Sequence, residues 1–157
     1  DNLGATIDPL IIGVFLRERA KGARVMIEVC DKVQGDKGGG PVHAEGHFQV
    51  VEEFRLPPGF DPSTVKVFST NTFVVDAQAL DETPVPWSWF HVEKNAFDRK
   101  AIQFERLIQE LTKAMPAAYL RVPREGARSR FLPVKDFGEL EKRRADIEAV
   151  ARTRGMM

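Results

Sequence analysis

The sequence begins with the signals of a capped helix, which are followed closely by those of a largely apolar strand. Asp8 and Pro9 provide an N-cap and a first helical position, and Gly22 stops the helix after an apolar stripe at residues 10, 11, 14 and 15. Residues 24–29 (Arg-Val-Met-Ile-Glu-Val) then predict a buried strand. A helix and a buried strand in close succession are typical of an α/β domain.

Further strand and turn signals set the type of sheet. Strands are predicted over 47–54, 65–68, 73–75, 87–92 and 119–122, with an extended piece over 130–134. A helix is predicted over 101–115, where one face would carry Phe104, Leu107, Ile108, Leu111 and Met115. A last helix starts at Asp136, which forms a capping box with Glu139. Because several strands follow one another without a helix, we predict an α/β fold with a mixed sheet flanked by helices, in a single domain over residues 1–157.

Charge and cysteine content exclude several classes of protein. The sequence has 23 Lys and Arg against 23 Asp and Glu, which gives no general attraction to nucleic acid or to an anionic membrane. The apolar stretch 10–16 is too short to span a bilayer. The single cysteine, Cys30, predicts a small buried residue at a strand end and fits a reducing, cytoplasmic environment.

Two polar segments are candidates for ligand binding, each with a structural alternative. Gly38-Gly39-Gly40 follows Lys37 and would let the backbone approach a ligand closely, or would simply form a flexible loop. The segment 69–72 (Ser-Thr-Asn-Thr) lies between two apolar strand pieces. Its side chains would hydrogen-bond sugar hydroxyls, or it would form a bulge or turn.

Charged residues near the two ends of the chain complete the candidates. Lys135 lies at a strand end just before a helix, where open α/β sheets bind ligands and where a cation suits phosphate. Asp1 would hold Mg²⁺ beside phosphates if it follows a strand. His43 and His47 flank Gly46 after the glycine loop, so a zinc site is not expected. The basic residues of the last helix, Lys142, Arg143, Arg144 and Arg152, predict a solvated face.

Taken in order, these segments resemble the UDP-glucose pyrophosphorylase family, the UTP–glucose-1-phosphate uridylyltransferases. Six segments over residues 1–138 carry the resemblance: 1–8 (DNLGATID), 28–32 with Asp36 and 39–40 (EVCDK, D, GG), 50–52 (VVE), 68–72 (FSTNT), 102–105 (IQFE) and 128–135 (RSRFLPVK). The last segment is the most specific of the six. The resemblance implies part of a Rossmann-like nucleotide-diphospho-sugar transferase domain that makes UDP-glucose and pyrophosphate from UTP and glucose 1-phosphate, with Mg²⁺.

The resemblance also implies roles for individual residues. It assigns the metal to Asp1 and contact with the phosphates to Lys135, which would be the catalytic residue. The positions that it assigns to substrate binding are Asp1, Asn2, Gly39, Gly40, Glu52 and Asn71. A reaction of this type needs alignment and cations rather than a protein nucleophile.

Some residues depart from the family pattern and leave alternatives open. Gly38 replaces a lysine, Pro41 a threonine, and Ser69 and Thr72 two asparagines, so another sugar 1-phosphate or a non-catalytic nucleotide-sugar-binding module stays open. The chain starts at Asp1 without an initiating methionine. We therefore expect a piece of the catalytic domain, which would lack turnover without the N-terminal nucleotide-loop half as its partner. A homo-oligomer is left open.

Overall fold

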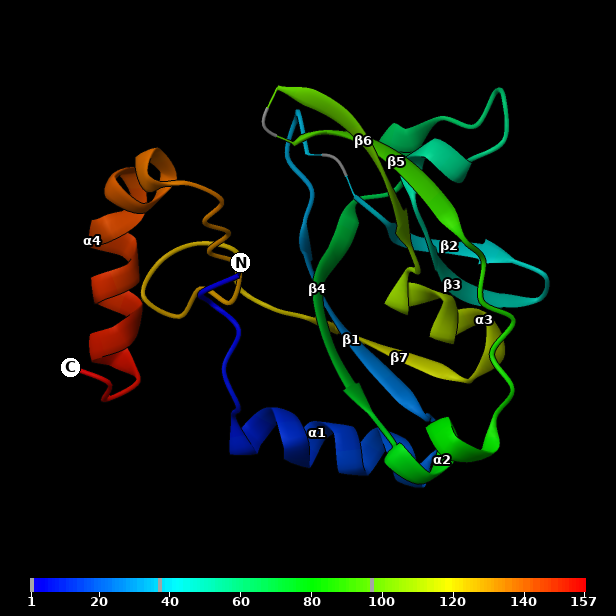
Figure 1. The fold of residues 1–157 in the computed structure, drawn as a ribbon. Helices are drawn as coiled ribbons and strands as arrows, with labels where there is room; N and C mark the ends of the chain where they lie inside the picture. Colours follow the sequence, from blue (N-terminus) through cyan, green and yellow to red (C-terminus); the bar gives the residue numbers. More distant parts are fainter. Residues whose placement is uncertain (1, 37, 97) are drawn as a thin grey trace.

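A computed structural model describes residues 2–36, 38–96 and 98–157 and has a three-stranded mixed sheet at its centre (Figure 1). Strand β1 (Val25–Asp31) lies in the middle, antiparallel to β4 (Val67–Val75) and parallel to β7 (Ala117–Arg121). Every residue of β1 except the last is buried, as its largely apolar sequence predicts. The predicted α/β class with a mixed sheet is confirmed.

Both faces of the sheet are covered. Helix α1 (Pro9–Ala20) packs Ile11 and Phe15 against Met26 on one face. The opposite face carries Ile27 and its neighbours on β1, which pack against the short helix α3 (Leu111–Ala114) and strand β3 (His47–Val51). Asp8 caps α1 through its Oδ1, which accepts a hydrogen bond from Leu10 N–H at 2.8 Å, as predicted.

A hairpin missing from the sequence prediction follows the glycine loop. Strand β2 (Gly40–Ala44) pairs with β3 through a two-residue turn, in which Glu45 and Gly46 have φ of 53° and 85°. This is the backbone that a tight hairpin requires. The prediction placed residues 40–41 in a loop, because the short β2 has no clear alternation of its own.

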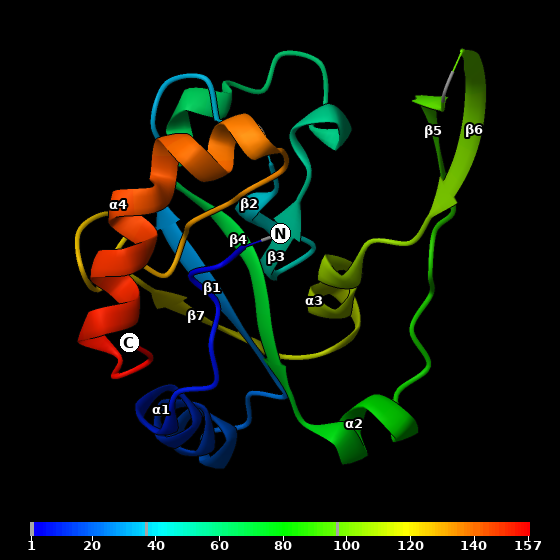
Figure 2. The ribbon, with the colours of Figure 1, turned by 60° about the vertical axis from the view of Figure 1, so that its left-hand side comes forward.

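The predicted helix over 101–115 is wrong. Residues Arg99–Glu105 form strand β6, which pairs with β5 (Phe90–Ala96) in a hairpin that stands away from the sheet (Figure 2). Only the end of the predicted segment is helical, as η3 (Ile108–Glu110) and α3. The pairing with β5 supplies hydrogen-bond partners from the preceding strand, and this outweighs a local periodicity of apolar residues.

The polar segment 69–72 lies inside one strand rather than between two. Ile27 faces Phe73 and Val29 faces Ser69, so three residues of β4 stand opposite Glu28 alone. Asn71 at the bulge has a φ of 60°. The bulge that we gave as the structural alternative is therefore present, and its extra residues push polar side chains out of the ladder.

The remaining elements are short except for the last helix. They are η1 (Glu53–Arg55), η2 (Pro62–Thr64), α2 (Ala77–Glu82) and α4 (Phe137–Thr153). The predicted N-cap of α4 is confirmed, since Asp136 Oδ1 accepts a hydrogen bond from Glu139 N–H at 2.8 Å, but the Glu139 carboxylate accepts from Lys135 N–H rather than from the cap residue itself. Cys30 is buried in β1, as predicted, and burial raises the pKa of its thiol to about 11. None of the helices in the described part of the chain has the length and apolar character needed to cross a membrane.

Candidate functional site

An open cavity of about 710 Å³ lies where the glycine loop, the bulge of β4 and the start of α4 meet. Of the sequence-predicted residues that the structure describes, it brings together Asn2, Gly39, Glu52, Asn71 and Lys135. These residues are distant in sequence, so the fold assembles them. The lining as a whole combines carboxylates and amides with cations.

Glu52 is one of the carboxylates that line the cavity. The amide of buried Gln109 donates a short hydrogen bond to Glu52 Oε1. Burial raises the pKa of the Glu52 carboxyl, and contacts from Gln109 and the backbone N–H of Gly39 only partly offset that rise. A carboxylate held this way can accept hydrogen bonds from hydroxyl groups.

Gly39 is required by the close approach of this carboxylate. A Cβ at Gly39 would lie 2.8 Å from Val50 Cγ1 and 3.1 Å from Glu52 Oε1, so no larger residue fits without a shift. The carbonyl of Gly39 accepts a hydrogen bond of 2.7 Å from Ser69 N–H, which ties the glycine loop to β4. The glycine signal in the sequence thus has a packing role at the cavity wall.

The bulge of β4 places Asn71 at the cavity. Its backbone N–H donates to Ser69 Oγ at 3.1 Å, and its side chain is exposed. Buried Thr70 anchors the bulge by donating its hydroxyl to Glu28 O at 3.1 Å. The amide of Asn71 is therefore held at the cavity by a strand that is anchored to β1.

Arg124 is a cation of the cavity wall that is paired with a carboxylate. Arg124 donates two hydrogen bonds to Asp36, of 2.6 and 3.0 Å, and its guanidinium lies 5.3 Å from the ring centres of both Phe68 and Phe131. Burial opposes ionisation of Asp36, yet hydrogen bonds from Arg124 and Val33 N–H lower its carboxyl pKa overall. Sequence reasoning missed this pair because its members are far apart in the chain.

Lys135 enters the cavity just before α4. Its backbone N–H donates to Glu139 Oε2 at 2.8 Å, which fixes the entry of the chain into the helix. Within residues 2–36, 38–96 and 98–157, the exposed ammonium group of Lys135 has no carboxylate at ion-pair distance. This cation lines the same cavity as Glu52.

A buried ion pair supports the segment that leads to Lys135. Arg130 donates from Nε and Nη2 to the two oxygens of Glu28, both at 2.6 Å. Both side chains are buried, and Arg130 also donates to Thr6 O at 3.1 Å. Since Glu28 belongs to the central strand, the pair anchors segment 128–135 to the sheet.

The other sequence-predicted positions have different surroundings. The side chain of Asn2 is hydrogen-bonded to the backbone. Its Nδ2 donates to Arg130 O at 3.0 Å, and its Oδ1 accepts from Leu132 N–H at 2.8 Å and from Gly4 N–H at 3.1 Å. Gly40 does not line the cavity, because it packs behind it, where a Cβ would lie 2.5 Å from Val65 Cγ1. Asp1 lies outside the described residues.

The structure does not test the predicted magnesium site. Among the residues described here, no group of three or more His, Cys, Asp or Glu side chains is arranged to hold a metal ion. Since Asp1 carries the assignment, Mg²⁺ stays a prediction. The described residues alone do not form a protein cage for a metal.

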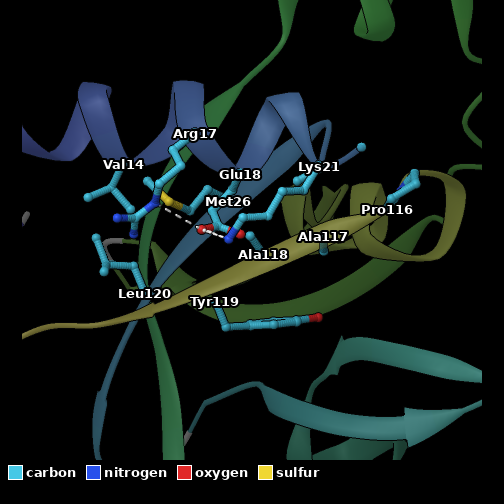
Figure 3. A pocket seen from close by; sticks show the side chains of 12 residues that line it. Val14, Arg17, Glu18, Lys21, Met26, Pro116, Ala117, Ala118, Tyr119 and Leu120 are labelled. Carbon is cyan, nitrogen blue, oxygen red and sulfur yellow. Dashed lines mark hydrogen bonds and ion pairs between the residues drawn. The ribbon is translucent and has the colours of Figure 1, made fainter.

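A second open cavity, of about 730 Å³, lies between α1 and β7 (Figure 3). Its cations, Arg17 and Lys21, both contact Glu18, at 3.4 and 2.9 Å. Its floor is apolar and includes Met26 and Leu120. No sequence signal pointed to this groove, and its charges are already paired.

The fold and the first cavity define an α/β domain that presents amides, a carboxylate and a lysine around a polar, ligand-sized space. The sequence matches the model of the family described as UTP–glucose-1-phosphate uridylyltransferase over residues 1–151. The chain belongs to this family, which is one of nucleotidyltransferase enzymes.

Solved structures with a similar fold come from trypanosomatid parasites. A point mutant of UDP-glucose pyrophosphorylase from Leishmania major is 25% identical, with a TM-score of 0.61. Another point mutant of the same enzyme, in complex with UDP-glucose, is 24% identical, with a TM-score of 0.60. The Trypanosoma brucei enzyme, described as UDP-glucose phosphorylase, is 23% identical, with a TM-score of 0.62.

The similarity covers most of this chain but a smaller part of each relative. In each of these comparisons it includes 89% of this chain and 34% of the other. The chain therefore spans about a third of the length of the structures that it resembles. No curated protein sequence matches it.

Proposed function

We propose that this chain forms the sugar-phosphate-binding part of a uridylyltransferase that makes UDP-glucose and pyrophosphate from UTP and glucose 1-phosphate. The observation that carries the proposal is the cavity in which Glu52, Asn71 and Lys135 meet. Hydroxyl groups of a hexose suit the carboxylate and the amide, and a phosphate suits the lysine. Membership of the family supports this assignment of the sugar and of the phosphate.

The chemistry of the proposed reaction makes modest demands on the protein. An oxygen of the sugar phosphate attacks the α-phosphorus of UTP, the bond from that phosphorus to the bridging oxygen of the β-phosphate breaks, and pyrophosphate leaves. No protein nucleophile takes part. Lys135 would offset charge on the phosphates, while Glu52 and Asn71 hold the sugar in line.

Mg²⁺ and the partner half of the domain belong to the same proposal. Mg²⁺ is a hard cation that binds carboxylates and substrate phosphates, and Asp1 is the residue that we expect to hold it. Because the chain spans 34% of the relatives' length, we infer that UTP binding and turnover need the remaining part of a longer polypeptide. We also infer a cytoplasmic location, on the basis of the single buried Cys30.

A pyrophosphate-release assay tests the proposal. The longer protein, with UTP and glucose 1-phosphate, is expected to release pyrophosphate, whereas residues 1–157 alone are expected to have no turnover. Release by residues 1–157 alone would refute the requirement for a second half. Absence of release from the longer protein with any sugar 1-phosphate would favour a non-catalytic binding module.

A second candidate is a pyrophosphorylase for another sugar. Ser69 and Thr72 replace two asparagines of the family pattern, and Ser69 Oγ already accepts the Asn71 N–H. The contacts available to the sugar therefore differ on this wall. A panel containing galactose 1-phosphate and N-acetylglucosamine 1-phosphate in the same assay decides between the sugars.

A further inference from the structure

The basic residues of α4 do not form one solvated face. Arg144 pairs with Glu141, and Arg152 pairs with Glu148 at 3.1 Å. Arg143 behaves differently, because it is half-buried and lines the cavity that holds Lys135. The sequence prediction is therefore wrong for this one arginine.

Helix geometry directs Arg143 toward Lys135. Side chains of an α-helix lean toward its N-terminus, so Arg143 covers the turn that contains Glu139. Glu139 lines the same cavity, which confirms that this face of α4 forms the wall. Lys135 lies directly before the helix, at the end toward which Arg143 leans.

Of the three cations that line this cavity, only one is paired with a carboxylate among the residues that the structure describes. Arg124, the third cation of the cavity, is neutralised by Asp36 at 2.6 Å. Over residues 2–36, 38–96 and 98–157, neither Lys135 nor Arg143 has a carboxylate within ion-pair distance. Glu139 instead accepts the backbone N–H of Lys135. Two cations that share a cavity repel each other until an anion enters.

We propose that Arg143 binds the phosphate group of the sugar 1-phosphate together with Lys135. The inference rests on the proposed function and adds a residue to it. A phosphate monoester carries a charge of about −1.5 to −2 at neutral pH, which matches two cations. The guanidinium fork bonds two phosphate oxygens at once, whereas the ammonium of Lys135 acts as a point charge.

Calorimetric titration of residues 1–157 with glucose 1-phosphate tests the proposal. Arg143→Ala is expected to weaken the affinity about tenfold or more, as for loss of a charged hydrogen bond. Arg143→Lys should recover part of it, because the charge remains while the fork is lost. Arg144→Ala is the matched control on the same helix, since Arg144 pairs with Glu141 outside the cavity. Thermal melts of all variants check that the fold is intact.

Phosphorus NMR measures the pKa of the bound phosphate, which would not change if Arg143 had only a structural role. The second pKa of a phosphate monoester is about 6, and neighbouring cations lower it. The pKa of bound glucose 1-phosphate should therefore lie higher in Arg143→Ala than in the unsubstituted chain or in Arg144→Ala. Equal affinities and equal phosphate pKa values for Arg143→Ala and Arg144→Ala would overturn the role of Arg143. That result would leave pyrophosphate release by the longer protein, and with it the proposed function, unaffected.

Discussion

Two of the open cavities have nearly the same volume but differ in whether their cations are paired with carboxylates. The α1–β7 groove measures about 730 Å³, and its Arg17 and Lys21 share the carboxylate of Glu18. The cavity at the start of α4 measures about 710 Å³ and leaves Lys135 and Arg143 without such partners in the described chain. Volume therefore does not identify the site. Cations without carboxylate partners, in a cavity that also holds the half-buried carboxylate of Glu52, do identify it, because a ligand must supply the missing partners.

The largest effect is expected where the site cavity depends on the buried ion pair. Arg130→Met leaves Glu28 charged and unpaired in the interior, which is expected to lower the free energy of unfolding by about 3–5 kcal/mol. Denaturant unfolding monitored by circular dichroism measures the loss. Arg17→Ala in the groove is the control, with an expected loss of about 1 kcal/mol or less. Equal losses would show that the pair does not anchor the site.

Lys135→Ala tests whether the free cation takes part in the reaction. In the longer protein, pyrophosphate release is expected to fall by a factor of about 10² or more, as for removal of a charge that stabilises the transition state. Lys21→Ala is the comparison from the groove, where the cation is already paired. An unchanged rate for Lys135→Ala would contradict the assignment.

Asn71 tests the sugar end of the cavity. Its φ of 60° is unfavourable for alanine, so Asn71→Ala changes both the side chain and the backbone energy. Asn71→Gly removes the side chain while it tolerates this φ, and it is expected to raise the apparent KM for glucose 1-phosphate about tenfold. Steady-state kinetics of the longer protein provide the measurement. A change in kcat alone, with KM unaltered, would remove Asn71 from sugar binding.

The smallest effect is expected from the pKa of Glu52. Burial raises its folded pKa above the unfolded value, so the ionised carboxylate lowers stability at neutral pH and the penalty vanishes below the unfolded pKa. Glu52→Gln should raise the melting temperature at pH 7 by about 1–3 °C, since 1 kcal/mol corresponds to roughly 2–4 °C at this chain length.

The difference between Glu52→Gln and the unsubstituted chain should shrink as pH falls through the folded pKa of Glu52. Calorimetric melts across the acidic range measure this dependence. Gln109 can still donate to the new amide oxygen, so the packing is preserved. A difference that is independent of pH would show that Glu52 carries no burial penalty.

Local signals predicted the parts of the fold that depend on neighbouring residues. The cap at Asp8, the buried strand around Ile27 and the N-cap at Asp136 are all present. Strand β6 was missed because its partner β5 determines its conformation, and pairing between strands is not visible in a window of one segment.

Some residues of the candidate site were likewise predicted from sequence segments, whereas others are identified only by tertiary packing. Glu52, Asn71 and Lys135 were found through ordered segments, and the structure brings them to one cavity. Gln109 was hidden by the wrong helix over 101–115, and Arg143 by its place among surface arginines. Their surroundings depend on tertiary packing, which no local pattern records.

A nitrogen-labelled NMR titration of residues 1–157 with glucose 1-phosphate tests the central claim most directly. We predict saturable shifts at the amides of Gly39, Asn71 and Lys135, and none in residues 117–120 of the α1–β7 groove. Shifts confined to the groove, or no saturable shifts at all, would contradict the claim that the cavity with unpaired charges is the sugar-phosphate site.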